Sequence, residues 1–89
     1  MSVILELSVF PLDNNAILSR FVAKSISIIK ESGLPYSLGT LSACIEGEWD
    51  NVMAVAKQCL DAASKDSKHV HVNMRVVWRD GAKNRLVTS

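Results

Sequence analysis

Glu6, Glu46 and Arg75 are the side chains of this 89-residue sequence whose types and spacing could act together chemically. Each lies in a stretch where polar and apolar residues alternate, as they do in a β-strand with one buried face. Two carboxylates on one sheet face would repel each other if close, and either Arg75 or a cationic ligand would relieve that repulsion. Two interpretations therefore stay open: a ligand site, or a Glu6–Arg75 pair between strands at an oligomer interface.

Smaller polar residues are expected on the same face as these charges. The candidate ligand-binding residues are Glu6, Ser8, Ser42, Cys44, Glu46, Asn73 and Arg75. Ser8 and Ser42 have no evident base and orienting acid of the kind that activates a nucleophile. We therefore expect binding rather than catalysis, and no catalytic residue is assigned.

Metal and cofactor chemistry has little support in the sequence. His69 and His71 share a strand face, but no third ligand is spaced to join them, so a solvated or interface role is favoured over a metal site. Cys44 and Cys59 have no CxxC or Cys/His spacing and fit buried thiols in a reducing compartment. We expect no metal and no cofactor.

Composition narrows the partners and the compartment. Ten basic and nine acidic residues give a net charge of +1 without a basic run, which argues against nucleic-acid and membrane binding. No signal peptide or membrane-spanning run is recognisable, so a cytoplasmic location is expected. The length predicts a single domain over residues 1–89. The 48% hydrophobic content is ordinary, but it is rich in Val, Ile and Leu, which favours an exposed apolar face and self-association.

One strand and one helix are expected in the first third of the sequence. Residues 3–10 alternate strictly, and Asp13 or Asn14 can cap a helix over about 15–32. Its apolar face is expected to follow the spacing of Leu18, Val22, Ile26 and Ile29, with Phe21 and Ile28 beside it. Gly33 suits the left-handed position that ends a helix.

The middle of the chain predicts a hairpin. Residues 36–38 and 41–46 form two short strands, with Gly39-Thr40 as a two-residue turn that places Leu38 opposite Leu41. Ser42, Cys44 and Glu46 then share one face.

The second half predicts a helix and a last strand. From Trp49 to Ala63 the apolar residues recur at helical spacing without a break, namely Trp49, Val52, Met53, Ala56, Cys59, Leu60 and Ala63. Residues 69–79 then alternate as a strand, with His71, Asn73 and Arg75 on one face. Residues 80–89 read as a polar tail.

This order is βαββαβ, which predicts an α+β, ferredoxin-like sandwich. Its antiparallel four-stranded sheet has the strand order 4-1-3-2, and both helices cover the apolar face. The charged and polar residues named above then converge on the opposite, open face.

Three motifs resemble the small single-domain members of the thiamine-binding-protein family in the YkoF-like superfamily. They are the opening MSVILELSVFPL, the segment IKESGLPY at 29–36, and IEGEWD at 45–50. The likeness runs through almost the whole chain. It implies a ferredoxin-like protomer, assembly through sheets into homodimers and homotetramers, and non-enzymatic binding of thiamine or its hydroxymethylpyrimidine moiety.

The resemblance also bears on individual residues. Glu6, Ser8 and Glu46 match the family's motif positions, whereas Asn73 and Arg75 come from strand alternation alone. The family usually carries Gly-Thr where this chain has Ser42-Ala43, and usually continues past the last strand into a further helix. These departures concern the ligand and the subunit contacts.

Overall fold

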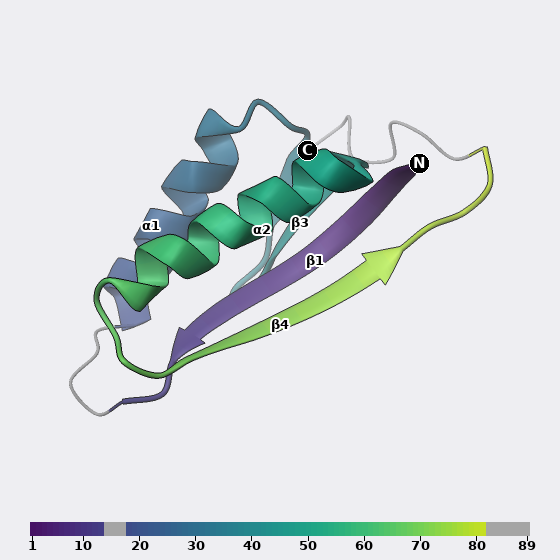
Figure 1. Ribbon diagram of the computed structural model, residues 1–89. Coiled ribbons are helices and arrows are strands. Elements are labelled where there is room, and N and C mark those ends of the chain that lie inside the picture. Colours follow the sequence, from purple (N-terminus) through teal and green to yellow (C-terminus); the bar gives the residue numbers. More distant parts are fainter. Residues whose placement is uncertain (14–17, 82–89) are drawn as a thin grey trace.

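Two helices cover one face of a four-stranded antiparallel sheet (Figure 1). A computed structural model describes residues 1–13 and 18–81. The elements in chain order are β1 (Ser2–Pro11), α1 (Leu18–Glu31), β2 (Tyr36–Leu38), β3 (Ala43–Glu48), α2 (Trp49–Ser64) and β4 (Val70–Val77). The sheet order is β2-β3-β1-β4, which is the predicted order 4-1-3-2 read from the other side. The βαββαβ prediction is confirmed.

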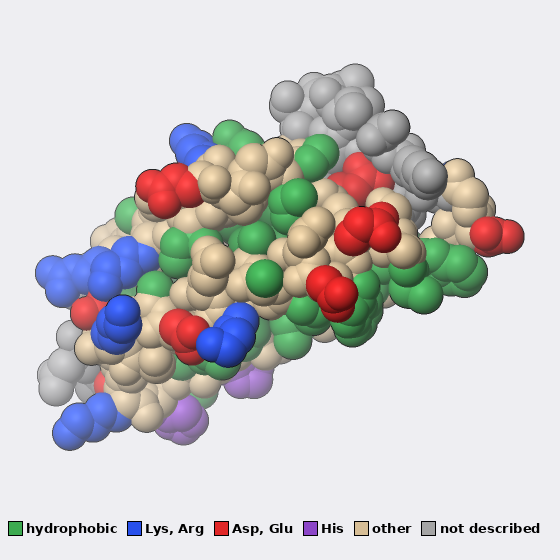
Figure 2. Space-filling view, turned by 45° about the horizontal axis from the view of Figure 1, so that its top comes forward, with side chains coloured by type: hydrophobic (Ala, Val, Ile, Leu, Met, Phe, Trp, Pro, Cys, Tyr) green, Lys and Arg blue, Asp and Glu red, His purple; other side chains and the backbone are tan. Residues whose placement is uncertain are grey.

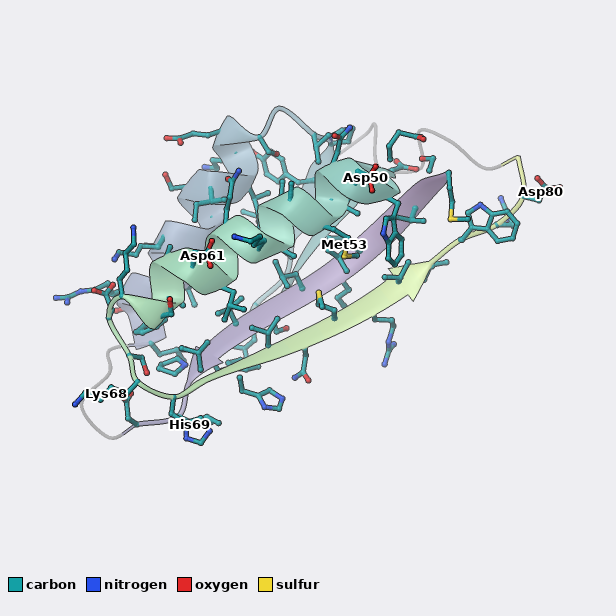
Figure 3. The ribbon with its side chains drawn as sticks, in the orientation of Figure 1. Asp50, Met53, Asp61, Lys68, His69 and Asp80 are labelled. Atoms are coloured by element: carbon teal, nitrogen blue, oxygen red, sulfur yellow. The ribbon has the colours of Figure 1, made fainter. Side chains whose placement is uncertain are left out.

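The central strand β1 separates the core from the open face. Val3, Leu5, Leu7 and Val9 are buried under the helices, while the residues between them stay half-buried. The largest fully buried side chains are Leu5, Ile29, Ile45, Val3, Val52 and Cys59. Met53 packs against this core from α2, and Figure 3 shows it on the side of the helix that faces the strands. Alternation in β1 therefore fixes which face the helices cover.

Helix α1 differs from the prediction in which residues it buries. Phe21 and Ile29 are its buried residues, whereas Leu18 is 43% exposed. The buried face of α1 is therefore rotated slightly from the predicted face. Helix α1 packs against both α2 and β1 rather than against the strand alone. Gly33 has φ +77°, so its predicted left-handed conformation is confirmed. The predicted helix start near 15 and the Asn14 cap lie outside the described residues.

The hairpin register was predicted wrongly. Leu38 pairs with Ala43, not Leu41, and residues 39–42 form a longer loop closed by the Gly39 N–H donating to the Ser42 carbonyl at 2.7 Å. Gly39 does not take the positive φ of the expected turn. A Cβ there would lie 3.2 Å from the Ser42 carbonyl oxygen, so close backbone approach favours glycine. The register is shifted by two residues, and an even shift leaves every side chain on its predicted face.

Helix α2 and strand β4 follow the prediction closely. Val52, Ala56, Cys59 and Ala63 are buried, as is Val55, which the spacing had not singled out. Trp49 and Leu60 lie at the margins of the buried stripe and are exposed. Of the predicted polar tail, residues 82–89 lie outside the described part of the chain. No helix in that described part is long and apolar enough to cross a membrane.

Asp13 joins two distant segments of the chain. Its carboxylate accepts a hydrogen bond from the Ser67 hydroxyl at 2.7 Å and another from the Lys68 N–H at 3.1 Å. These two bonds lower the pKa of Asp13 below its ordinary value. The end of β1 is thereby tied to the segment that leads into β4.

Candidate functional site

Strand register places the predicted polar residues side by side on the open face. Glu6 lies between Cys44 of β3 and Arg75 of β4, and Ser8 lies opposite Asn73. Residues directly opposite in an antiparallel pair have Cβ atoms about 4.5–5.5 Å apart, so these side chains can contact one molecule. The structure thus brings Glu6, Ser8, Asn73 and Arg75 together.

A hollow of about 420 Å³ lies over this part of the face. It is lined by Glu6, Ser8, Leu41, Ser42, Asn73, Met74 and Arg75. Ser42 enters from the loop between β2 and β3, so three separate parts of the chain contribute polar groups. Cys44 and Glu46, the other two predicted ligand residues, share the face without lining the hollow.

Glu6 and Arg75 are register partners, yet no ion pair joins them in the described part of the chain. A structural role as a cross-strand salt bridge would require their charged atoms to be in contact. Both charges instead stand at the wall of an open hollow. This arrangement leaves a carboxylate acceptor and a guanidinium donor available to a bound molecule.

His71 orients Asn73 at one side of the hollow. Its Nε2 lies 3.0 Å from the Asn73 Oδ1, and both residues are on the open face of β4. When Nε2 carries the proton it donates to the amide oxygen, which leaves the Asn73 NH₂ group to donate elsewhere. The sequence favours a solvated or interface role for His71 over a metal site and places it on one face with Asn73, and their i, i+2 spacing could have suggested this contact.

Cys44 and Glu46 lie along β3 beyond the hollow. Burial raises the pKa of the Cys44 thiol, and the charge of Glu6 raises it further. The thiol is therefore held in its protonated, weakly nucleophilic form at neutral pH. Glu46 is opposite Ile4, diagonal to Glu6, and only 3% exposed. Its carboxylate lies beneath the surface.

Two apolar residues of the hollow were not predicted. Leu41 is expected in a strand and instead belongs to the loop, while Met74 pairs with the buried Leu7 and so belongs to the helix side of β4. Both positions depend on the path of a loop or the location of a sheet edge, which alternation does not encode. The aromatic residues Phe10, Tyr36 and Trp78, any of which could stack on a ring, do not line the hollow.

The described residues include no group of three or more His, Cys, Asp or Glu side chains that could hold a metal ion. What the hollow offers is one carboxylate, one guanidinium, two hydroxyls and an amide beside two apolar side chains. Such a set suits a small polar molecule that carries both donors and acceptors.

Comparison with known proteins places the whole chain in one group. A UPF0045 protein of Mycobacterium bovis is 31% identical over 87 residues, covering 97% of this chain and 85% of the relative. Among solved structures, a hypothetical Methanocaldococcus protein has a TM-score of 0.86 at 23% identity, covering 98% and 90% of the two chains.

A Thermotoga maritima protein provisionally assigned to thiamine biosynthesis or salvage has a TM-score of 0.84 at 18% identity, covering 99% of this chain and 95% of its own. At these identities the two solved structures show the fold alone. The family described as thiamine-binding protein matches residues 5–88, nearly the full length. The chain therefore belongs to the thiamine-binding protein family.

Proposed function

We propose that this protein binds thiamine, or a related aminopyrimidine, in the hollow on the open sheet face and does not transform it. The observation that carries the proposal is the placement of Glu6 and Arg75 at one hollow without an ion pair between them. Membership in the thiamine-binding protein family supports the ligand class. The proposed ligand-binding residues lining the hollow are Glu6, Ser8, Ser42, Asn73 and Arg75.

The chemistry of the ligand matches these groups. An aminopyrimidine presents ring acceptors and an exocyclic amine donor, and the thiazolium of thiamine is a fixed cation. In our proposal Glu6 accepts from the amine or faces the cation, and Ser8, Ser42 and Asn73 supply the remaining hydrogen bonds. The hollow volume of about 420 Å³ is within the usual range of about 300–1,000 Å³ for small-molecule sites.

Cys44 and Glu46 have a different place in the proposal. Both lie on the same face outside the hollow, so we assign them to its support along β3 rather than to direct contact. In our proposal the hollow binds without catalysis, because the described residues that line it include no histidine or lysine to act as a base for Ser8 or Ser42.

Thermal unfolding with added thiamine tests the ligand. At a concentration a hundred times its dissociation constant, the ligand should stabilise the fold by about 2.7 kcal/mol, which raises the melting temperature visibly. Glu6→Gln should abolish this rise. Glu31→Gln is the matched control, because Glu31 is exposed at the end of α1 on the helix side.

Thiamine, its phosphates and the free hydroxymethylpyrimidine should be tested separately. If none of them shifts the melting temperature of the unaltered protein, the proposed ligand class is wrong. If Glu6→Gln and Glu31→Gln respond equally well, the ligand binds elsewhere than in this hollow.

A second candidate function is a structural or regulatory homo-oligomer, a homodimer or homotetramer, whose open face is buried between subunits. It is favoured by Val77, which follows Arg75 on that face and is 47% exposed. Sedimentation distinguishes the two: Arg75→Met should change the subunit count if the face is an interface. An unchanged count with a lost ligand response would contradict this candidate.

We further propose that the chain folds as one domain in the cytoplasm. Both cysteines are free, as expected in a reducing compartment. Fractionation of the expressing cells would test the location.

A further inference from the structure

Strand β1 loses one of its two neighbours before it ends. Its pairs with β3 stop at Leu7 and Ala43, whereas its pairs with β4 continue to the end of the strand. The next pair with β3 would be Val9 with Leu41, but Leu41 belongs to the loop of residues 39–42, and no ladder pair joins the two. At Val9 the sheet therefore continues on one side only.

The peptide groups of Val9 point toward the side where β3 has ended. In an antiparallel sheet, alternate residues of a strand direct their N–H and C=O to opposite sides. The Met1 carbonyl accepts from the Trp49 N–H on the β3 side, so the odd-numbered residues of β1 face β3. The Leu12 N–H donates toward β4, as this alternation requires.

Val9 is nevertheless buried, with 8% of its surface exposed. Within the part of the chain that the structure describes, no hydrogen bond includes its N–H or C=O. The outer edge of β4 is different, because hydrophobic side chains gather at the surface toward its end (Figure 2) and residues 73–77 are exposed, so water reaches its peptide groups. Buried backbone groups are almost always paired, since they otherwise lose their bonds to water. The peptide groups of Val9 therefore require a partner of another kind.

A small cavity lies against Val9. It has a volume of about 40 Å³ and is lined by Val9, by Val22 of α1 and by the loop of residues 39–42, among others. We call it the inner cavity. Ser8 and Ser42 line both the inner cavity and the hollow, so the two spaces adjoin at the same loop. One water molecule needs about 10–15 Å³, so the inner cavity has room for a methyl group but not for a whole ligand.

We propose that the N–H and C=O of Val9 bind the amine-bearing edge of the ligand's pyrimidine ring. This inference rests on the proposed function and specifies how the ligand is recognised. On that edge a ring nitrogen acceptor lies beside an exocyclic amine donor, so the two can pair with one residue of a strand as a neighbouring strand would. The methyl group beside that ring nitrogen enters the inner cavity, and the rest of the ligand lies in the hollow.

This binding mode determines the role of Glu6. Glu6 lines the hollow and not the inner cavity, so it faces the thiazolium cation of thiamine while Val9 binds the amine. Glu6→Gln should therefore remove the response to thiamine and leave the response to free hydroxymethylpyrimidine, which has no thiazolium, unchanged. Loss of both responses in this variant would show that Glu6 binds the amine, which contradicts the Val9 contact.

An ester at residue 9 tests the Val9 contact directly. The α-hydroxy acid analogue of valine replaces only the N–H by oxygen, and Cys44 provides the junction for ligating a synthetic segment 1–43 to the rest of the chain. The ester should weaken binding of hydroxymethylpyrimidine about tenfold, which is the order of one hydrogen bond. Its melting temperature without ligand should stay close to that of the unaltered chain, because the Val9 N–H has no partner in the described residues.

The matched control is the same ester at residue 5. Leu5 is opposite Ile45 and directs its N–H toward β3, so this ester loses a bond of the sheet. It should lower the melting temperature and leave the affinity of the folded protein unchanged. If the two esters lower the melting temperature equally, the Val9 N–H has a protein partner and the inference is overturned.

Calorimetric titration of the unaltered chain and both esters separates this inference from the proposed function. If the unaltered chain and the residue 9 ester bind hydroxymethylpyrimidine equally well, the Val9 contact is wrong and the proposed function stands. If the unaltered chain binds neither thiamine nor hydroxymethylpyrimidine, the proposed function fails and the Val9 contact fails with it.

Discussion

The two faces of β1 belong to one strand but follow different rules. On the helix side, Leu5 is fully buried and its neighbours on that side are nearly so. On the other side, Glu6 and Ser8 border an open hollow and remain partly exposed. The first face is constrained by packing density, where even one methylene matters. The open face is constrained by the ligand that we propose it binds. A substitution on the open face should therefore alter binding with little effect on the fold.

The largest effect should come from the packed face. Leu5→Ala removes most of a fully buried side chain, so the free energy of unfolding should fall by about 2–5 kcal/mol. Ile4→Ala is the matched control on the same strand, because Ile4 is only half-buried on the open face. Urea unfolding of both variants measures the difference. Equal losses would mean that the two faces are not distinct in packing.

The two cysteines report on the faces separately. Cys59 is 1% exposed on the buried face of α2, whereas Cys44 is half-buried on the open face of the sheet. Iodoacetamide should therefore alkylate Cys44 in the native protein and Cys59 only after unfolding, as peptide mapping would show. Comparable labelling of both in the native state would contradict the described packing.

The pH dependence of Cys44 alkylation tests whether this thiol is activated. Burial raises the pKa of Cys44 above its ordinary 9.0. Because the thiolate is the reactive form, the labelling rate should reach half its maximum above pH 9.0. A rate that levels off below that pH would show an activated thiol instead. Cys44 would then be a candidate for chemistry rather than support.

A smaller effect on stability is expected from Glu6→Gln. Its charge has no ion-pair partner in the described residues, so the free energy of unfolding should change by no more than about 0.5 kcal/mol. Urea unfolding without ligand measures this directly. A loss of several kcal/mol would show that Glu6 stabilises the fold, which would contradict its assignment to ligand binding.

The smallest effect should appear at Asp13, which is half-buried after the end of β1. Its hydrogen bonds from Ser67 and Lys68 lower its pKa in the folded state. Its contribution is therefore complete above the ordinary aspartate pKa and is lost as pH falls through the lowered value. Melting temperatures of the unaltered protein and Asp13→Asn should differ slightly at neutral pH and converge in acid. A difference that grows in acid would contradict this sign.

Strand alternation predicted most of the fold and the open face because its period is fixed by backbone geometry. It placed Glu6, Ser8, Asn73 and Arg75 on one surface before any register was known, and β1 and β4 bear that out. The hairpin was missed because Gly39 resembled a tight-turn glycine, while its actual constraint is the nearby Ser42 carbonyl. The error left Ser42 on the correct face, since the shift was even.

The other residues of the hollow depend on where the strands end and on which strand forms the edge of the sheet. Met74 lines the hollow because β4 is an edge strand, and Leu41 does so because the loop is longer than two residues. The buried face of α1 was misplaced for a similar reason, since α1 packs against α2 as well as β1, with Phe21 buried and Leu18 exposed. Such features arise from tertiary packing, which the periodicity of a single helix or strand does not contain.

The central position of β1 has a consequence for biosynthesis. Its residues leave the ribosome before those of its partners β3 and β4, and the Pro11–Val70 pair closes a loop through most of the described chain. Non-local pairings of this kind form slowly, because loop closure must precede the contacts. The apolar face of β1 is therefore exposed throughout synthesis. Chaperones that hold nascent chains should engage this first strand until β4 has emerged.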